Sequence, residues 1–295
     1  MCAVDQKARA FTDSDVQTLT KLAGVAVSLL KSYRATLDLD DQLTDAVALQ
    51  EKMLPGNARI EHIQSACPLD VASYYKARDG IGGDIWGIEA TNPQRVFLYA
   101  ADFTGHGIAA ALNTARFHSF VHIASQRTDK PASMLRRLNE RLREVLPVGQ
   151  FATMFCATLD FTAKIMEYAS AGSPPQLYRR SSEESFELLS KPSLPLGIMR
   201  DAVFESETVP FEPGGALVLY TDGLIETPRP PDPIFTPDSL RALLNAFPRG
   251  NAAELSNKIT SALFFEPAIE VDDDLTMIVA MHTGVGVESC LDYEI

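Results

Sequence analysis

Four places that lie far apart in the sequence combine an aspartate with turn residues beside a predicted strand. These places are Gly82–Asp84, Asp102–Gly107, Thr221–Gly223 and Asp272–Asp274. Each adjoins an apolar run typical of a strand, so each carboxylate is predicted at a strand end, pointing out of the rim of a sheet. The neighbouring glycines allow the backbone to approach a ligand without a clash from Cβ.

A cluster of such carboxylates has a specific chemistry. Carboxylates that lie close together all stay ionised only where a cation neutralises them. Oxygen ligands select hard ions, so we expect Mg²⁺ or Mn²⁺ rather than Zn²⁺. Two such ions, about 4 Å apart, can activate a water molecule and hold a phosphoryl group. An aspartate before a glycine is also a common turn pair, so any one place alone is more often structural.

The elements that would position these aspartates follow from hydrophobic periodicity and turn residues. Strands are predicted at 71–77, 85–89, 96–101, 153–160, 164–170, 176–178, 186–189, 203–209, 216–221 and 275–281. Helices are predicted at 107–126, 131–145, 237–246 and 252–264. Strand hairpins on either side of a central helix pair predict an α+β fold, with two packed antiparallel β-sheets flanked by α-helices.

The first 54 residues have a different, helical pattern. Thr12–Asp15 is a helix-start signal, and apolar residues at helical spacing predict one helix to about residue 33 and a second at 38–54. Two amphipathic helices without a local sheet need a partner surface, which is the main domain, a second copy or an upstream sensor domain. We therefore predict a regulatory or dimerisation segment at 1–54, a main domain at 55–285 and a tail at 286–295.

The composition limits the partners. The 295 residues carry a formal net charge of −13, which disfavours nucleic acid and anionic membranes. The chain shows no signal-peptide pattern, and its apolar runs are far shorter than the roughly 20 residues of a membrane helix. Its four cysteines form no CxxC pair, which favours a reducing compartment. We expect a cytoplasmic protein without membrane insertion.

The four acidic motifs, in this order, resemble the metal-dependent protein phosphatase (PPM) superfamily, and in detail its bacterial SpoIIE and RsbU branch. The resemblance spans about residues 50–283, with further matches at Tyr168–Pro175, Pro195–Ile198 and Gln50–Pro55. The full ordered set is specific, although each motif alone is weak. The resemblance implies a sandwich of two antiparallel sheets flanked by helices.

The resemblance also implies roles for individual residues. Asp102 would bridge two Mn²⁺ or Mg²⁺ ions, and the backbone carbonyl of Phe103 would bind one of them. Asp222 and Asp273 would hold one ion, and Asp84 would serve the other, directly or through water. A water between the ions would attack phosphorus in line, which makes Asp102 and Asp222 the predicted catalytic residues.

His106 and Arg78 are two further candidates. His106 would be a general acid for the leaving serine oxygen, because imidazole titrates near neutrality, or it would only order the turn. Arg78 would bind phosphate, since guanidinium matches phosphate oxygens, or it would form a surface ion pair with Asp79 or Glu89. Trp86 stands where the family has small or branched residues, and we expect it to pack at the sheet edge.

The implied function is that of a phosphoserine/phosphothreonine protein phosphatase. Substrates in this branch are small regulatory proteins, typically anti-sigma-factor antagonists, and the N-terminal helices would carry a signal and form a homodimer. The alternative is a catalytically inactive phosphatase-fold binding module in a signalling switch, which the intact acidic positions disfavour. A two-metal nuclease is a third hypothesis, which the acidic composition disfavours.

Overall fold

A computed structural model describes residues 12–105, 107–125, 130–227, 235–247, 250–264 and 271–284. The chain divides into two compact units, Met1–Leu49 and Gln50–Ile295. His106 and the predicted tail at 286–295 lie outside the described residues. Within the described part of the chain, no helix is both long enough and apolar enough to cross a membrane.

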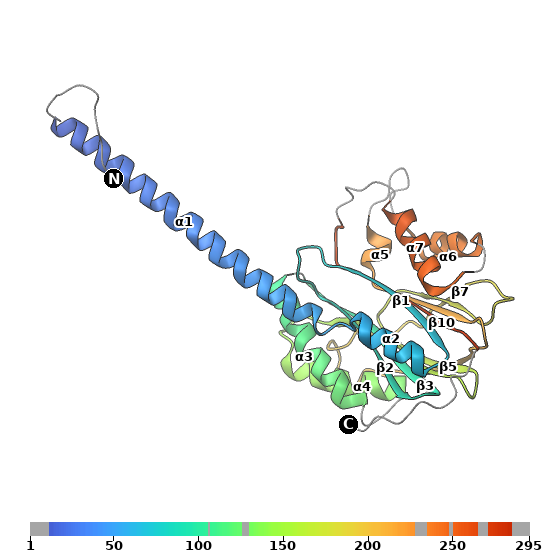
Figure 1. Cartoon of the computed structure of the whole chain (residues 1–295). Helices are drawn as coiled ribbons and strands as arrows, with labels where there is room; N and C mark the ends of the chain where they lie inside the picture. Colours follow the sequence, from blue (N-terminus) through green and yellow to red (C-terminus); the bar gives the residue numbers. More distant parts are fainter. Residues whose placement is uncertain are drawn as a thin grey trace. The chain divides into compact units, whose positions relative to one another are not determined.

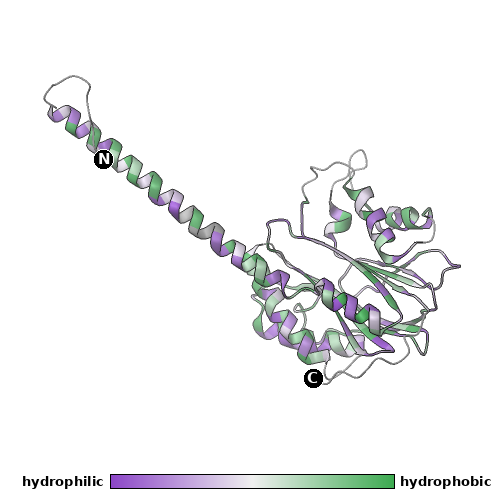
Figure 2. Ribbon diagram, in the orientation of Figure 1, coloured by the Kyte–Doolittle hydropathy of each residue, from purple (hydrophilic) through white to green (hydrophobic). Residues whose placement is uncertain are grey.

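A single helix, α1 (Asp13–Glu51), occupies the region where two helices were predicted. That prediction was wrong, because Arg34–Leu37 contains neither glycine nor proline and the helix continues through it. At its start the backbone amide of Asp15 donates to the Thr12 hydroxyl, and the amide of Thr12 donates to the Asp15 carboxylate. Hydrophobic and hydrophilic residues alternate along its length (Figure 2).

The second unit contains two five-stranded antiparallel sheets (Figure 1). One has the order β1-β10-β9-β6-β7 and the other the order β2-β3-β4-β5-β8. The strands of the first sheet are β1 (Leu69–Lys76), β10 (Leu275–His282), β9 (Ala216–Tyr220), β6 (Gln176–Arg179) and β7 (Glu187–Leu189). Those of the second are β2 (Asp84–Asn92), β3 (Arg95–Phe103), β4 (Ala152–Asp160), β5 (Ile165–Ala171) and β8 (Glu207–Pro210).

Helices cover the outer faces of both sheets. On the second sheet lie α3 (Ile108–Ser125) and α4 (Pro131–Val145), and on the first lie α6 (Pro237–Asn245) and α7 (Ala252–Leu263). Two short helices were not predicted: α2 (Asn57–Ala66), which packs against β1 and β2, and α5 (Gly223–Glu226), which follows β9. The resulting order of layers, helices–sheet–sheet–helices, confirms the predicted fold class.

Alternation along the strands divides the core into three clusters. On β2, Trp86 and Ile88 face the core between the sheets, whereas Ile85 faces the cluster under α3 and α4. The third cluster lies between the first sheet and α5–α7. Trp86 belongs to an edge strand, but only 2% of it is exposed, because its indole is buried between the two sheets.

Candidate metal centre

The strand register brings the four acidic motifs to one end of the sandwich. Asp84 opens β2 and lies directly opposite Asp102, near the end of β3. In the other sheet, Tyr220 at the end of β9 pairs with Met277 near the start of β10. Asp222 therefore follows one strand at the same end where Asp273 precedes the other. The charges of both act on Asp102, which places the four carboxylates within electrostatic range of one another.

Asp84 is a buried carboxylate that connects the two sheets. Its Oδ2 accepts hydrogen bonds from the hydroxyls of Thr221 (2.7 Å) and Thr276 (2.6 Å), which belong to the opposite sheet. Its Oδ1 is buried and has no hydrogen-bond partner among the described residues. Burial and the nearby charge of Asp102 raise the pKa of Asp84 well above its ordinary value, although the two hydroxyls oppose this shift. Neither hydroxyl was predicted as part of the site, although Thr221 stands within one acidic motif and Thr276 follows another by two residues.

Asp102 and Asp222 also hold a proton more tightly than ordinary carboxylates when no cation is present. Burial, followed by the charges of Asp222 and Asp273, raises the pKa of Asp102 to about 8. Burial, followed by the charges of Glu226 and Asp273, raises the pKa of Asp222 to about 6. Ionised carboxylates at this end therefore destabilise the metal-free fold. A bound cation would remove that cost.

Phe103 is held by both its side chain and its backbone. Its ring is buried and meets the ring of Phe117 on α3 edge-on, with centroids 5.3 Å apart. Its backbone amide donates to the carbonyl of Gly83 at 3.1 Å. A Cβ on Gly83 would lie 2.6 Å from the Phe103 carbonyl oxygen, which is closer than real contacts allow. Glycine at 83 is thus required for the Phe103 carbonyl, a predicted metal ligand, to keep its position.

The run Asp272–Asp274 contains carboxylates with different surroundings. Asp274 is 2% exposed and accepts hydrogen bonds from the backbone amides of Arg78 (2.8 Å) and Gly83 (2.5 Å). Asp273 is partly exposed, and its Oδ1 accepts a hydrogen bond from the backbone amide of Asp274 at 2.8 Å. Asp274 therefore fixes the loop before β2, whereas the carboxylate of Asp273 stays accessible to a metal ion.

Arg78 is exposed, and its guanidinium donates to the backbone carbonyl of Asp272 at 2.7 Å. This contact holds the positively charged guanidinium of Arg78 beside the loop that carries Asp273. Glu89, one alternative partner considered for Arg78, lies 3.6 Å from Arg59 and 3.7 Å from His122. His106 is outside the described residues, so its role stays a prediction.

The donor set fits hard divalent cations. It consists of carboxylates and one backbone carbonyl, and the unpartnered Oδ1 of Asp84 is an oxygen that a cation or its water would satisfy. In the described ranges, no three Asp, Glu, His or Cys side chains form a ready cluster around a single ion. Mg²⁺ usually keeps several waters and binds through one or two carboxylates, so the donors present suit ions that remain partly hydrated.

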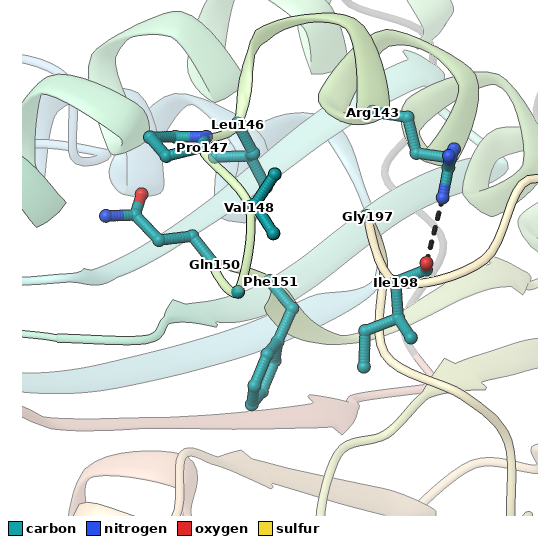
Figure 3. Close-up of a pocket in the computed structure, with 9 residues that line it drawn as sticks. Arg143, Leu146, Pro147, Val148, Gln150, Phe151, Gly197 and Ile198 are labelled. Carbon is teal, nitrogen blue, oxygen red and sulfur yellow. Dashed lines mark hydrogen bonds between the residues drawn. The ribbon is translucent and has the colours of Figure 1, made fainter.

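A pocket of about 440 Å³ lies between the end of α4 and two loops (Figure 3). Its lining includes Arg143, Val148, Phe151 and Ile198, and the Arg143 guanidinium donates to the Ile198 carbonyl at 2.8 Å. None of the predicted metal ligands lines this pocket. It is connected to them through Thr104, whose backbone amide and hydroxyl both donate to the carbonyl of Phe151, at 3.0 and 3.1 Å.

Comparisons with known proteins agree with this arrangement. Two curated Bacillus subtilis (strain 168) proteins are similar to the chain. RsbP is 28% identical to it, over 66% of this chain and 47% of RsbP. RsbU is 26% identical to it, over 72% of this chain and 62% of RsbU. The chain thus spans about half to three fifths of the length of these relatives. The solved SiaA-PP2C domain of Pseudomonas aeruginosa shares the fold, with a TM-score of 0.73 and 20% identity over 84% of this chain and 98% of that domain. The model of the Stage II sporulation protein E (SpoIIE) family matches residues 92–283, more than half of the chain, and the chain belongs to that family.

Proposed function

We propose that this protein is a metal-dependent phosphoserine/phosphothreonine protein phosphatase whose substrate is a small bacterial regulatory phosphoprotein of the anti-sigma-factor antagonist type. The observation that carries the proposal is the facing pair Asp84 and Asp102, with one buried carboxylate oxygen left unpartnered. Membership of the SpoIIE family supports it. The relatives RsbP and RsbU are both named phosphoserine phosphatases, which supports the substrate class.

Two Mn²⁺ or Mg²⁺ ions would activate a water molecule and neutralise the charge of the phosphoryl group. In this proposal Asp102 would bind both ions, and the Phe103 carbonyl would bind one of them. Asp222 and Asp273 would hold one ion, and Asp84 would serve the other, directly or through water. Thr221 and Thr276 fix the orientation of Asp84 by donating to its Oδ2. The protein thereby holds its donors in place before the ions bind.

Two residues would act on the phosphate group itself. The Arg78 guanidinium already lies beside the loop of Asp273, and it would move from the Asp272 carbonyl to a phosphate oxygen. His106 would protonate the leaving serine or threonine oxygen. Arg78 is exposed and lies outside the buried carboxylates.

We also propose that α1 forms a homodimer as a coiled coil. Apolar or small residues alternate at spacings of three and four, as the seam of a coiled coil requires. The positions are Val16, Leu19, Ala23, Ala26, Leu30, Tyr33 and Leu37. Leu30 and Tyr33 are 66% and 65% exposed, so they are available to a second copy.

The segment at 1–54 would then regulate a phosphatase domain at 55–285, followed by a tail at 286–295. A cytoplasmic location stays a prediction from the sequence.

Turnover of p-nitrophenyl phosphate and of a phosphoserine peptide, with and without Mn²⁺, tests the activity. We expect metal-dependent turnover, and Asp222→Asn should lower kcat by about 10²-fold or more, because one ion loses a charged ligand. Asp238→Asn, an exposed substitution of the same kind on α6, is the control and should leave turnover unchanged. Absence of turnover at saturating Mn²⁺ would refute the enzyme and favour the inactive binding module. Near-normal turnover by Asp222→Asn would refute the assigned site.

A further inference from the structure

Gln50 is a buried polar residue whose side chain reaches the loop that precedes Asp84. It lies in the last turn of α1 and belongs to the second compact unit. Only 4% of it is exposed. Its Nε2 donates to the carbonyl of Gly82 at 2.7 Å, and its Oε1 accepts from the backbone amide of Gly82 at 3.0 Å. The side-chain amide thus satisfies both backbone groups of one residue, as a strand neighbour would.

The same side chain also contacts α3. Its Nε2 lies 3.3 Å from the hydroxyl of Thr114, a fully buried residue on that helix. The α3 helix begins directly after the Asp102–Gly107 motif. Gln50 therefore binds one loop and one helix, each of which adjoins a predicted metal ligand.

Gly82 is confined from its other side by Asp274. A Cβ on Gly82 would lie 2.3 Å from Oδ2 of Asp274, so the backbone there has no room to shift toward that carboxylate. The next residue, Gly83, donates to Asp274 and accepts from the backbone amide of Phe103. Any displacement of Gly82 would therefore move both Asp84 and the Phe103 carbonyl. The amide of Gln50 is the contact that resists such a displacement.

We infer that Gln50 is a positioning residue for the metal centre: its side-chain amide holds Gly82 in the place where Asp84 and the Phe103 carbonyl face the ions. The inference rests on the proposed function, because it needs the assigned ligands. It makes the end of α1 part of the metal-binding architecture. Loss of a partner that orients a metal ligand commonly weakens metal binding by 10–100-fold.

The test compares Gln50→Met, which keeps the length of the side chain but not its hydrogen bonds, with a matched control. Asn139→Leu is suitable, because Asn139 is also a buried amide (2% exposed) that bonds loop backbone, at Gly197 and Met199. Mn²⁺ binding is measured directly, from free Mn²⁺ by electron paramagnetic resonance, and thermal unfolding is measured in EDTA. We expect Gln50→Met to raise the Mn²⁺ dissociation constant by about tenfold. Asn139→Leu should lower Tm to a similar extent and leave Mn²⁺ binding unchanged.

Activity at increasing Mn²⁺ provides a second measurement. The Mn²⁺ concentration for half-maximal turnover should rise in Gln50→Met by the same factor as the dissociation constant, while kcat at saturating Mn²⁺ recovers. Thr114→Val removes the hydroxyl that Gln50 contacts, together with the bond of that hydroxyl to the Ala111 carbonyl within α3. It leaves both bonds between Gln50 and Gly82, so it should show a smaller shift of the same sign, and it replaces Gln50→Met if that variant does not fold. Unchanged Mn²⁺ binding in both variants, or an equal loss in Asn139→Leu, would overturn the inference. Wild-type protein that binds Mn²⁺ without turnover would instead refute the proposed phosphatase and leave the role of Gln50 measurable.

Discussion

Replacing Asp102 by asparagine should stabilise the metal-free protein at neutral and alkaline pH. The carboxylates of Asp84, which is buried, and Asp102, which is partly buried, face each other at one end of the sandwich. Desolvation and the charges of Asp222 and Asp273 raise the pKa of Asp102 to about 8. The unfolded chain has an ordinary value of 3.8 for this group. The folded state therefore binds the proton more tightly than the unfolded state. Ionisation of Asp102 consequently lowers the free energy of unfolding. This loss is zero below about pH 4, grows as pH rises, and is constant above about pH 8.

The size of the effect follows from the same two pKa values. At pH 7 about three pH units separate the solution from the unfolded value, and each unit corresponds to about 1.4 kcal/mol, which sets a ceiling of about 4 kcal/mol. The pair can share one proton, so the wild-type protein does not carry the full cost of two charges. We therefore expect Asp102→Asn to raise the free energy of unfolding by about 2 kcal/mol at pH 7, or Tm by about 4–8 °C. At pH 5 the gain should be less than about 1 kcal/mol.

Urea unfolding in EDTA at a series of pH values measures the difference. Asp160→Asn is the control with the opposite sign, because the amide of Ala163 and the guanidinium of Arg95 outweigh partial burial and hold the pKa of Asp160 below its ordinary value. Its carboxylate contributes stability above about pH 4 that is lost as pH falls through the folded pKa, so Asp160→Asn should be destabilised at pH 7. An Asp102→Asn protein that is no more stable than wild type at pH 8 in EDTA would refute the electrostatic reasoning. At saturating Mn²⁺ wild type should be more stable than Asp102→Asn, because only wild type offers the Asp102 carboxylate to the ions and so gains more stability from binding them.

Two substitutions test the backbone approach at the metal centre and the dimer. Gly83→Ala should reduce Mn²⁺ affinity by at least about tenfold, because its Cβ would displace the Phe103 carbonyl. Gly56→Ala, whose Cβ would meet open space, should bind Mn²⁺ like wild type. Calorimetric titration measures both affinities, and equal values would contradict the assignment of the Phe103 carbonyl as a ligand. Leu30→Glu should convert a dimer to a monomer in sedimentation equilibrium, because Leu30 lies in the proposed seam. Val25→Glu should not, because Val25, which is also exposed (58%), lies away from the seam. A wild-type monomer would exclude the coiled coil.

Much of the fold could be predicted because local pattern and turn chemistry agree with the tertiary structure. The hairpin of β2 and β3 and the helix α4 lie at or within a few residues of their predicted places. Local structure was predicted wrongly or missed where the sequence signal was weak. The break near residue 37 was inferred without a helix-breaking residue, and α2 carries its hydrophobic pattern in only ten residues. The strand predicted at 203–209 is limited to Glu207–Pro210, because only that part pairs with β5.

The sequence by itself determined that four motifs place an aspartate and turn residues at a strand end, and the order of these motifs indicated the family. Local pattern could not decide which carboxylates face each other, because that depends on strand register and on the packing of two separate sheets. Only the tertiary structure placed Asp84 opposite Asp102 and brought the hydroxyls of Thr221 and Thr276 to it from the other sheet. The burial of Gln50 against Gly82 is likewise a long-range contact, between the end of a helix and a loop 32 residues away. Such contacts leave no periodic trace in the sequence, since they arise only when elements pack against one another.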